Sequence, residues 1–372
     1  MSERTPFNPG EIYSPQGANA GPAPGVFISP QRYVQGAGIL ENVGRYLGLM
    51  RVNRIAVLAS ARGFGADVGR MIDALSSYDV VRSEFQGECS VPEIEARVAE
   101  IADANVDVLI AAGGGKCVDA GKAIAWRLDV PCVVVPTLAS NDAPCSALSM
   151  LYTPEGLTVG AEFYPQSPAL VVVDTAVVAS ASERYLVAGM GDAMATWYEA
   201  RVCLNNPAGF TPLGARPTLA SCALGEVCAK TLYEQGEHAL QAVAAGEVDL
   251  ALEQVVEANT LLSGIGFESG GIAAAHSVAQ GYPAVAQVHA NYLHGEMVAM
   301  GLLAQLMMED DTAEARRAAT FFARVGLPVH LGQLSMDPGD KELDTVAELA
   351  AEFPLIANMP CLLYTSPSPR DA

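Results

Sequence analysis

The sequence predicts an α/β N-terminal domain with a Rossmann-like parallel sheet, followed by an all-α C-terminal domain. Three observations predict this division. Buried-strand runs alternate with helical patterns over the first half of the chain, and a glycine-rich turn joins one strand to a helix. From residue 182 onward the chain consists of long segments rich in Ala, Leu, Glu and Val, with few strand signals. We therefore expect the domains at residues 31–180 and 181–360.

The first 30 residues are rich in Pro, Gly, Ser and Asn, which predicts a flexible N-terminal extension. They lack the apolar core of a secretory signal. The folded part is expected to begin at Tyr33, with a helix over Leu40–Leu49 and a buried strand over Arg54–Ala59. The following GFGADVG, at 63–69, narrowly misses the spacing of the dinucleotide-binding fingerprint and is a weak signal.

The next elements continue the alternation of strand and helix. Asp79–Phe85 has the pattern of a strand, and a capping box at Ser90–Glu93 opens a helix with an apolar stripe at four-residue steps. A further apolar strand, Ala169–Val173, ends at Asp174. Alternating strands and helices favour a parallel sheet covered by helices on its faces.

The stretch around which this domain is organised runs from residue 108 to residue 152. A buried strand, Val108–Ala112, leads into Gly113, Gly114, Gly115 and Lys116, and a helical pattern begins at once. A second apolar strand, Cys132–Val135, closes the unit. A helix N-terminus offers free backbone N–H groups and a favourable dipole to an anion, and glycines let a diphosphate approach closely. The turn therefore predicts a diphosphate-binding loop.

A polar cluster follows the second of these strands directly. It comprises Thr137, Ser140, Asn141, Asp142 and Ser146. Ligands of open α/β sheets bind at the carboxyl ends of the strands. We therefore expect the glycine turn and the polar cluster to line one crevice.

Composition excludes several classes of partner. Charged residues are 17% of the chain, and acidic residues outnumber basic ones, 42 against 21, which gives a net charge of −21. Nucleic acids and anionic membrane surfaces both require basic protein surface, so neither is an expected partner. No apolar run approaches the roughly 18 residues of a membrane helix. Eight cysteines without a C-x-x-C pair indicate reduced thiols in a cytoplasmic protein.

Polar residues are sparse in the helical half, where helices are expected over 182–204, 213–235, 237–268, 270–280, 291–308, 312–325 and 340–352. The three exceptions are Asp192, His276 and His294. A helix break is expected at Gly281 and Pro283, so the two histidines should lie on different helices. One carboxylate and two imidazoles form a ligand set for Zn²⁺ or Fe²⁺. The alternative is that each histidine is a hydrogen-bonded structural residue of the core.

Several ordered motifs together resemble the glycerol dehydrogenase family, within the iron-containing alcohol dehydrogenase superfamily. They are YVQGAG at 33–38, GGGK-x-x-D at 113–119, VVPTLASNDAPCSALSMLYT at 134–153, GMGDAMATWYEA at 189–200, EANTLLSGIGFESGGIAAAH at 257–276 and HGEMVAMG at 294–301. The resemblance covers residues 33–360. It implies the dehydroquinate synthase-like architecture of this superfamily, with the active site between its two domains.

The resemblance also implies roles for individual residues. Asp192, His276 and His294 match the family's metal ligands, with zinc usual in this branch and iron elsewhere. The glycine turn and Lys116 match the diphosphate loop. Asp142 matches an acidic residue close to the nicotinamide and the polyol, although Asn-Asp-Ala-Pro at 141–144 would equally favour a turn or cap aspartate. The other positions expected to line the cofactor are Ser60, Asp119, Thr137, Ser146 and Leu148.

The activity implied is hydride transfer between glycerol and NAD or NADP, giving dihydroxyacetone. The expected partner is a small polyol, and the family implies a homo-oligomer, often an octamer. Three alternatives stay open: a dehydrogenase of another small diol or hydroxyketone, a lyase similar to dehydroquinate synthase, and a cofactor-binding paralogue without turnover. The lyase would need basic residues for a phosphorylated substrate, and the 137–146 cluster contains none.

The chain departs from the family in three places. At the position of Ser60, relatives commonly carry an acidic residue that selects NAD. Here that carboxylate is missing and Arg62 follows two residues later, so use of NADP, or of both cofactors, is expected. The alternative is that Arg62 is a solvated loop residue. Many relatives have a histidine at the position of Ala279. The end of the chain, CLLYTSPSPRDA at 361–372, resembles a non-native tail that replaces a last helix.

Overall fold

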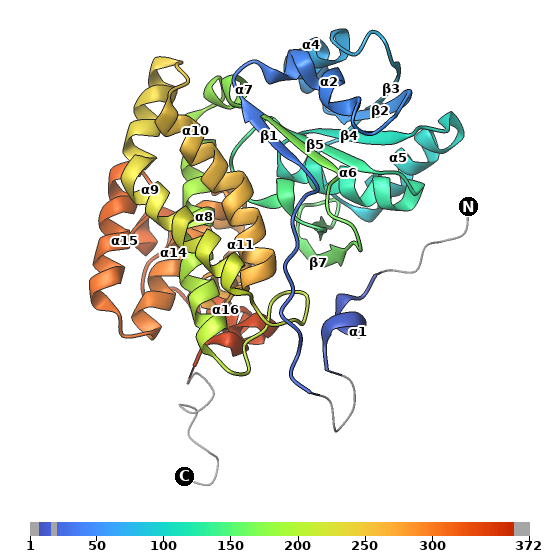
Figure 1. Ribbon diagram of the computed structural model, residues 1–372. Helices are drawn as coiled ribbons and strands as arrows, with labels where there is room; N and C mark the ends of the chain where they lie inside the picture. Colours follow the sequence, from blue (N-terminus) through green and yellow to red (C-terminus); the bar gives the residue numbers. More distant parts are fainter. Residues whose placement is uncertain (1–6, 16–20, 361–372) are drawn as a thin grey trace.

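The computed structural model describes residues 7–15 and 21–360. It consists of an α/β part up to residue 182 and a helical part that begins at α8 (Glu183–Asn205), and the two lie side by side (Figure 1). The structure thus confirms the predicted fold class. The predicted tail, 361–372, lies outside the described residues, as do residues 1–6 and 16–20 of the predicted extension.

Six parallel strands form the main sheet, in the order β1-β8-β5-β4-β2-β3. Their bounds are Tyr33–Gly36 (β1), Arg54–Ala59 (β2), Asp79–Glu84 (β3), Val108–Gly113 (β4), Cys132–Pro136 (β5) and Leu170–Asp174 (β8). Parallel strands that are buried on both faces have nearly continuous apolar sequences, and β4, β5 and β8 do. Each predicted strand is present, within about two residues at its ends.

Helices cover both faces of the sheet. One face packs against α2 (Val43–Leu47), α4 (Asp67–Asp73) and α7 (Thr175–Ala179), and the other against α5 (Val91–Ile101) and α6 (Gly115–Leu128). Alternate residues of a strand point to opposite faces, so Ile55 and Val57 enter the first core while Ala56 and Leu58 enter the second. Between β2 and α4 lies the short α3 (Ala61–Phe64).

A two-stranded antiparallel hairpin lies apart from the main sheet, below it in Figure 1. Its strands are β6 (Leu148–Tyr152) and β7 (Thr158–Phe163), joined by a turn at Gly156, which has a φ of 89°. This hairpin was not predicted from the sequence. Its strands are short and only partly buried, so they lack the apolar runs that identified the other strands.

The helical part contains nine α-helices among the described residues. They are α8, α9 (Leu219–Ala245), α10 (Leu250–Glu257), α11 (Ser263–Gly270), α12 (Ala274–Gly281), α13 (Ala286–Asn291), α14 (His294–Met308), α15 (Thr312–Val325) and α16 (Glu342–Glu352). The predicted break near residue 236 is wrong, because α9 continues to Gly246, where a φ of 68° ends it. Gly236 instead lets the Phe321 ring pack closely against α9. No helix of the described chain is long and apolar enough to cross a membrane.

The described residues ahead of β1 run along the helical part. Helix α1 (Pro9–Tyr13) follows Phe7, which pairs with Phe163 of β7. Further on, Gly25 pairs with Arg216, and the Ile28 N–H donates to the Ser269 hydroxyl at 2.9 Å. These contacts link the start of the chain to both parts of the molecule (Figure 1).

Candidate metal and cofactor site

Asp192, His276 and His294 lie together in the helical part, on α8, α12 and α14 respectively. One ligand atom from each lies within 4.8 Å of the others. Asp192 Oδ1 is 3.4 Å from His276 Nε2 and 3.5 Å from His294 Nε2. Asp192 and His276 are buried, while the His294 side chain is 42% exposed, so the cluster opens on the His294 side.

Close packing of α8 against α14 brings His294 to Asp192. Gly295 packs against the backbone of α8 so tightly that a Cβ there would overlap the Ala188 carbonyl oxygen. Gly191 likewise contacts the Gly295 carbonyl. Only glycine allows two helix backbones to approach this closely. The arrangement therefore depends on the small residues beside Asp192 and after His294.

A buried glutamate on α8 orients His276. Both Glu199 and Asp192 lie on one face of this helix, seven residues apart. Glu199 Oε2 is bonded to His276 Nδ1, while Oε1 accepts from the backbone N–H groups of Ala273, at 2.7 Å, and His276, at 2.9 Å. A carboxylate on Nδ1 fixes the tautomer that leaves Nε2 free to bind a metal. Sequence analysis missed this role, although the seven-residue spacing could have indicated it.

The pKa shifts of Asp192 and His294 favour the forms that bind a cation, the ionised carboxylate and the neutral imidazole. Burial lowers the pKa of His294. Burial also opposes charge on Asp192 and His276, but the carboxylate–imidazole contacts prevail, lowering the pKa of Asp192 and raising that of His276. Asp192 Oδ1 is buried without a hydrogen-bond donor among the described residues. A buried, unpaired carboxylate oxygen facing two imidazole nitrogens is the ligand set expected for zinc or ferrous iron.

Asp142 connects this cluster to the α/β part. It follows β5, its backbone N–H donates to Asp192 Oδ2 at 3.3 Å, and its carboxylate accepts from the Ser263 hydroxyl at 3.2 Å. Burial and the neighbouring Asp192 carboxylate raise the pKa of Asp142 well above its usual range. Asp142 also precedes a short 3₁₀ turn, Ala143–Cys145, but its side chain does not cap that turn. The structure therefore places Asp142 beside the metal-ligand cluster.

The glycine turn lies next to Asp142. Helix α6 begins at Gly115 directly after β4, so its first N–H groups point out at the carboxyl end of the sheet. A Cβ on Gly115 would be 2.3 Å from Asn141 Nδ2, so only glycine fits beside that amide. Lys116 is exposed, bonds Glu88 Oε2 at 2.6 Å, and lies 5.0 Å from the centre of the Tyr152 ring. The turn and the metal-ligand cluster thus meet through residues 141 and 142.

The remaining predicted cofactor residues occupy two kinds of position. Thr137, partly exposed, bonds the Gly113 carbonyl through its N–H at 3.0 Å and so lies beside the glycine turn. Ser146 and Leu148 are buried below the 3₁₀ turn, where β6 begins. Asp119 is also buried, paired with Lys122 at 2.9 Å and bonded to the Met150 N–H at 3.1 Å. In this structure the Asp119 carboxylate supports the hairpin.

Ser60 lies at the carboxyl end of β2, the strand next to β4. Its hydroxyl accepts from the Gly63 N–H at 3.2 Å and thereby caps α3. Arg62 is exposed on this helix, and the Arg82 guanidinium of β3 lies 5.7 Å from the ring centre of Phe64. Arg62 therefore lies on the helix that begins at the carboxyl end of β2, and Arg82 lies close to that helix through Phe64.

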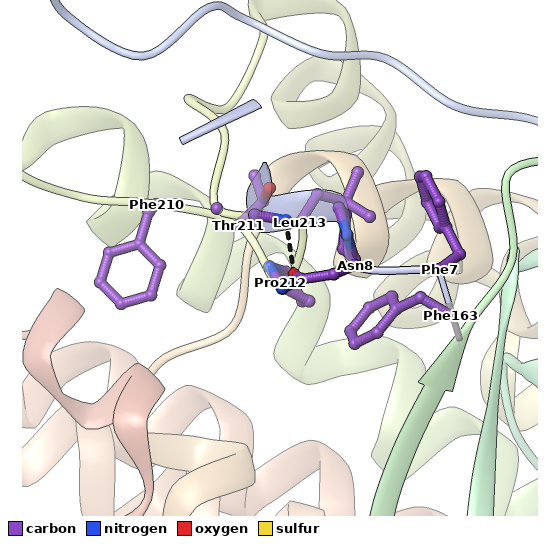
Figure 2. A pocket seen from close by; sticks show the side chains of 10 residues that line it. Phe7, Asn8, Phe163, Phe210, Thr211, Pro212 and Leu213 are labelled. Carbon is purple, nitrogen blue, oxygen red and sulfur yellow. Dashed lines mark hydrogen bonds between the residues drawn. The ribbon is translucent and has the colours of Figure 1, made fainter. Parts of the chain in front are cut away.

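A separate cavity of about 390 Å³ lies away from these residues. Figure 2 shows Phe7 and Phe163 on one side of this cavity and Phe210 on the other. Its lining includes none of the metal-ligand cluster, the glycine turn or the polar cluster. The candidate site is therefore the junction of β4, β5, α8, α12 and α14, not this cavity.

Comparison with known proteins gives consistent matches. The family described as iron-containing alcohol dehydrogenase matches residues 30–175. A glycerol dehydrogenase of Pseudomonas putida is 45% identical over 339 residues, covering 89% of this chain and 92% of its own. A glycolaldehyde reductase of Halobacterium salinarum is 40% identical, with 88% and 90% covered. The crystal structure of a Schizosaccharomyces pombe glycerol dehydrogenase superposes with a TM-score of 0.86 at 34% identity, covering 93% of this chain and 87% of its own.

Proposed function

Because this chain belongs to the glycerol dehydrogenase family of iron-containing alcohol dehydrogenases, we propose that it oxidises glycerol to dihydroxyacetone with a nicotinamide cofactor and a divalent metal. The observation that carries this proposal is the meeting of Asp192, His276 and His294 beside Asp142 and the glycine turn. An oxidoreductase of this kind needs a cation and a dinucleotide next to each other.

In this proposal Asp192, His276 and His294 hold the cation, for which zinc is the first choice and ferrous iron the second. When bound, the cation supplies Lewis acidity to the reaction. The chain itself contributes orientation: Glu199 aims the His276 ring, and the buried surroundings of Asp192 exclude water. His294, partly exposed, lies on the side from which substrate would enter.

The cofactor would lie between the glycine turn and the metal-ligand cluster. Gly113, Gly114 and Gly115 would let the diphosphate reach the N-terminus of α6, with Lys116 close by. Thr137, Ser146 and Leu148 would line the path from the diphosphate towards the nicotinamide. Asp142, with Ser263 donating to its carboxylate, would hold a substrate hydroxyl and fix the reacting carbon opposite the nicotinamide ring.

The test is a purified-protein assay with glycerol and a panel of small diols and hydroxyaldehydes, following reduced cofactor by absorbance. We expect turnover with glycerol that is lost on metal chelation and restored by added zinc or ferrous iron. A chelator-resistant activity, or no turnover with any member of the panel after metal loading, would contradict the proposal. The panel also includes glycolaldehyde, because the Halobacterium salinarum relative is named as its reductase.

We further propose that the protein accepts NADP, alone or beside NAD. The support is chemical: the position after β2 is Ser60, which has no carboxylate to repel a 2′-phosphate, and Arg62 and Arg82 are nearby. A hydrogen bond from an arginine to the charged phosphate contributes on the order of 1.5–3 kcal/mol when the two groups are in direct contact. That energy is sufficient to shift cofactor preference.

Arg62→Gln is expected to raise the KM for NADP about tenfold while leaving the KM for NAD within about twofold, because only NADP carries the phosphate. Initial rates with both cofactors measure this. Arg45→Gln, an exposed arginine on α2, is the matched control and should change neither value. Strong NAD preference in the wild-type enzyme would refute the idea.

The assembly and location proposed for this enzyme are a homo-oligomer, such as an octamer, in the cytoplasm. The support for a reducing compartment is that the seven cysteines of the described residues are all free thiols. The net charge of −21 argues against a nucleic-acid partner. Sedimentation of the purified protein measures the number of subunits.

A further inference from the structure

Glu268 of α11 is a charged residue in the interior that the proposed reaction does not use. Its side chain is fully buried. Both carboxylate oxygens accept from one donor, the backbone N–H of Ala147, at 3.0 and 3.1 Å. A buried carboxylate with a single partner is costly, so its presence indicates a role other than stability.

Ala147 stands between Ser146 and Leu148, two of the residues that the proposed function assigns to the cofactor. The turn before it, residues 143–146, is held by Lys122 of α6. Lys122 is also buried, and its ammonium donates to the Ala143 carbonyl at 2.8 Å and to the Ser146 hydroxyl at 3.0 Å. One segment of the α/β part is therefore fixed between a cation of its own domain and an anion of the helical domain.

We propose that Glu268 is a positioning residue for the cofactor side of the site: its ionised carboxylate holds the Ala147 N–H and thereby fixes Ser146 and Leu148. This inference rests on the proposed function, since it concerns how that cofactor is bound. Among the described residues the Glu268 carboxylate has hydrogen bonds only to the backbone of Ala147. It therefore acts through the segment and is a positioning residue, not a catalytic residue.

The ionisation of Glu268 makes this role measurable. Burial raises the pKa of Glu268 to about 7, against the opposing effects of the Ala147 hydrogen bond and of Lys122. The charged and titratable groups that face it are Lys122, which is paired with Asp119, and the thiol of Cys145, which burial keeps protonated. A carboxyl group whose pKa is raised in the folded state stabilises the fold while it is protonated. This stability is lost as the pH rises from about 4.5, the ordinary pKa of a glutamate, through about 7.

A positioning role and a purely structural role therefore predict different results for Glu268→Gln. The amide keeps one acceptor oxygen for the Ala147 N–H but carries no charge. If the charge serves to position the segment, the variant should unfold at a higher temperature than wild type at pH 8 and yet bind cofactor more weakly there. A purely structural carboxylate would lose thermal stability and affinity together.

The experiment titrates NADH and NADPH into the metal-loaded proteins, by fluorescence, from about pH 6 to about pH 9. We expect the affinity of the wild-type protein for the cofactor to rise roughly threefold to tenfold as the pH increases through 7, because a charged hydrogen bond replaces a neutral one. The affinity of Glu268→Gln should not change with pH. The KM for the cofactor should rise in the variant while the KM for glycerol stays unchanged.

Glu253→Gln is the matched control. Glu253 also joins the two parts, accepting from Gln35 Nε2 and from the Thr175 hydroxyl, both at 2.7 Å, but it does not touch residues 143–148. Its variant should keep the wild-type pH profile. The inference is overturned if Glu268→Gln shares the wild-type profile or loses affinity in parallel with stability. A wild-type protein that binds neither cofactor would overturn the proposed function itself, a separate result.

Discussion

Replacing Asp192 with Asn is expected to lower the turnover of glycerol by at least about a thousandfold. The substitution is isosteric but removes the negative charge that faces both His276 Nε2 and His294 Nε2. Loss of the cation removes several kcal/mol of transition-state stabilisation, and each 1.36 kcal/mol is a factor of ten in rate. Turnover at saturating glycerol and the metal content of the purified variant, by elemental analysis, measure the effect together.

The control for this variant is Asp103→Asn, which changes an exposed aspartate in the 3₁₀ turn that follows α5. It changes net charge equally and should keep full activity and metal. Because Asp192 is buried, circular dichroism and thermal unfolding must show that the variant is folded. A folded Asp192→Asn protein that retains both metal and activity would remove the foundation of the proposed metal site.

Glu199→Gln is expected to weaken metal binding by about 10- to 100-fold, the usual consequence of losing a carboxylate behind a ligating histidine. A glutamine amide can donate to His276 Nδ1, which favours the tautomer whose Nε2 carries a proton and cannot bind a cation. Activity measured against free zinc concentration should shift to higher zinc and recover at saturation. Asp192→Asn should show no such recovery.

This difference in recovery separates the two roles, since a lost ligand cannot be replaced by mass action over the same range. Glu226→Gln, an exposed glutamate of α9, serves as the control and should leave the zinc dependence unchanged. If Glu199→Gln has the zinc dependence of wild type, then the Glu199–His276 contact does not orient a metal ligand.

Much of the fold could be predicted because its elements bury continuous apolar runs. The strand Val108–Gly113 and, after Arg54, the strand Arg54–Ala59 consist of apolar or small residues, and this pattern arises when both faces of a parallel sheet are covered. The glycine turn after β4 carries its own local signal. Where local signals are weaker, prediction failed: the β6–β7 hairpin was missed, and a helix break was assigned to Gly236 when it lies at Gly246.

The residues of the candidate site also divide into those that the sequence identified and those that only the structure revealed. The resemblance named Asp192, His276 and His294, and Gly281 with Pro283 already separated the two histidines. Neither the resemblance nor the local sequence could reveal that Glu199 holds the His276 ring, or that Asp119 pairs with Lys122 inside the protein. A residue's sequence context gives its chemical type and its face on a helix. Its partners come from elements that lie far away in the chain.

The sequence by itself determined most strands of the main sheet, most of the helices, the glycine turn and the chemical types of side chain in the candidate site, because each depends on neighbouring residues. Only the tertiary structure decided the strand order, the glycine contacts that bring α14 onto α8, and the fixing of residues 143–147 between Lys122 and Glu268. Those features join residues as far apart in the chain as Tyr33 and Val171, and they exist only when the whole core has packed.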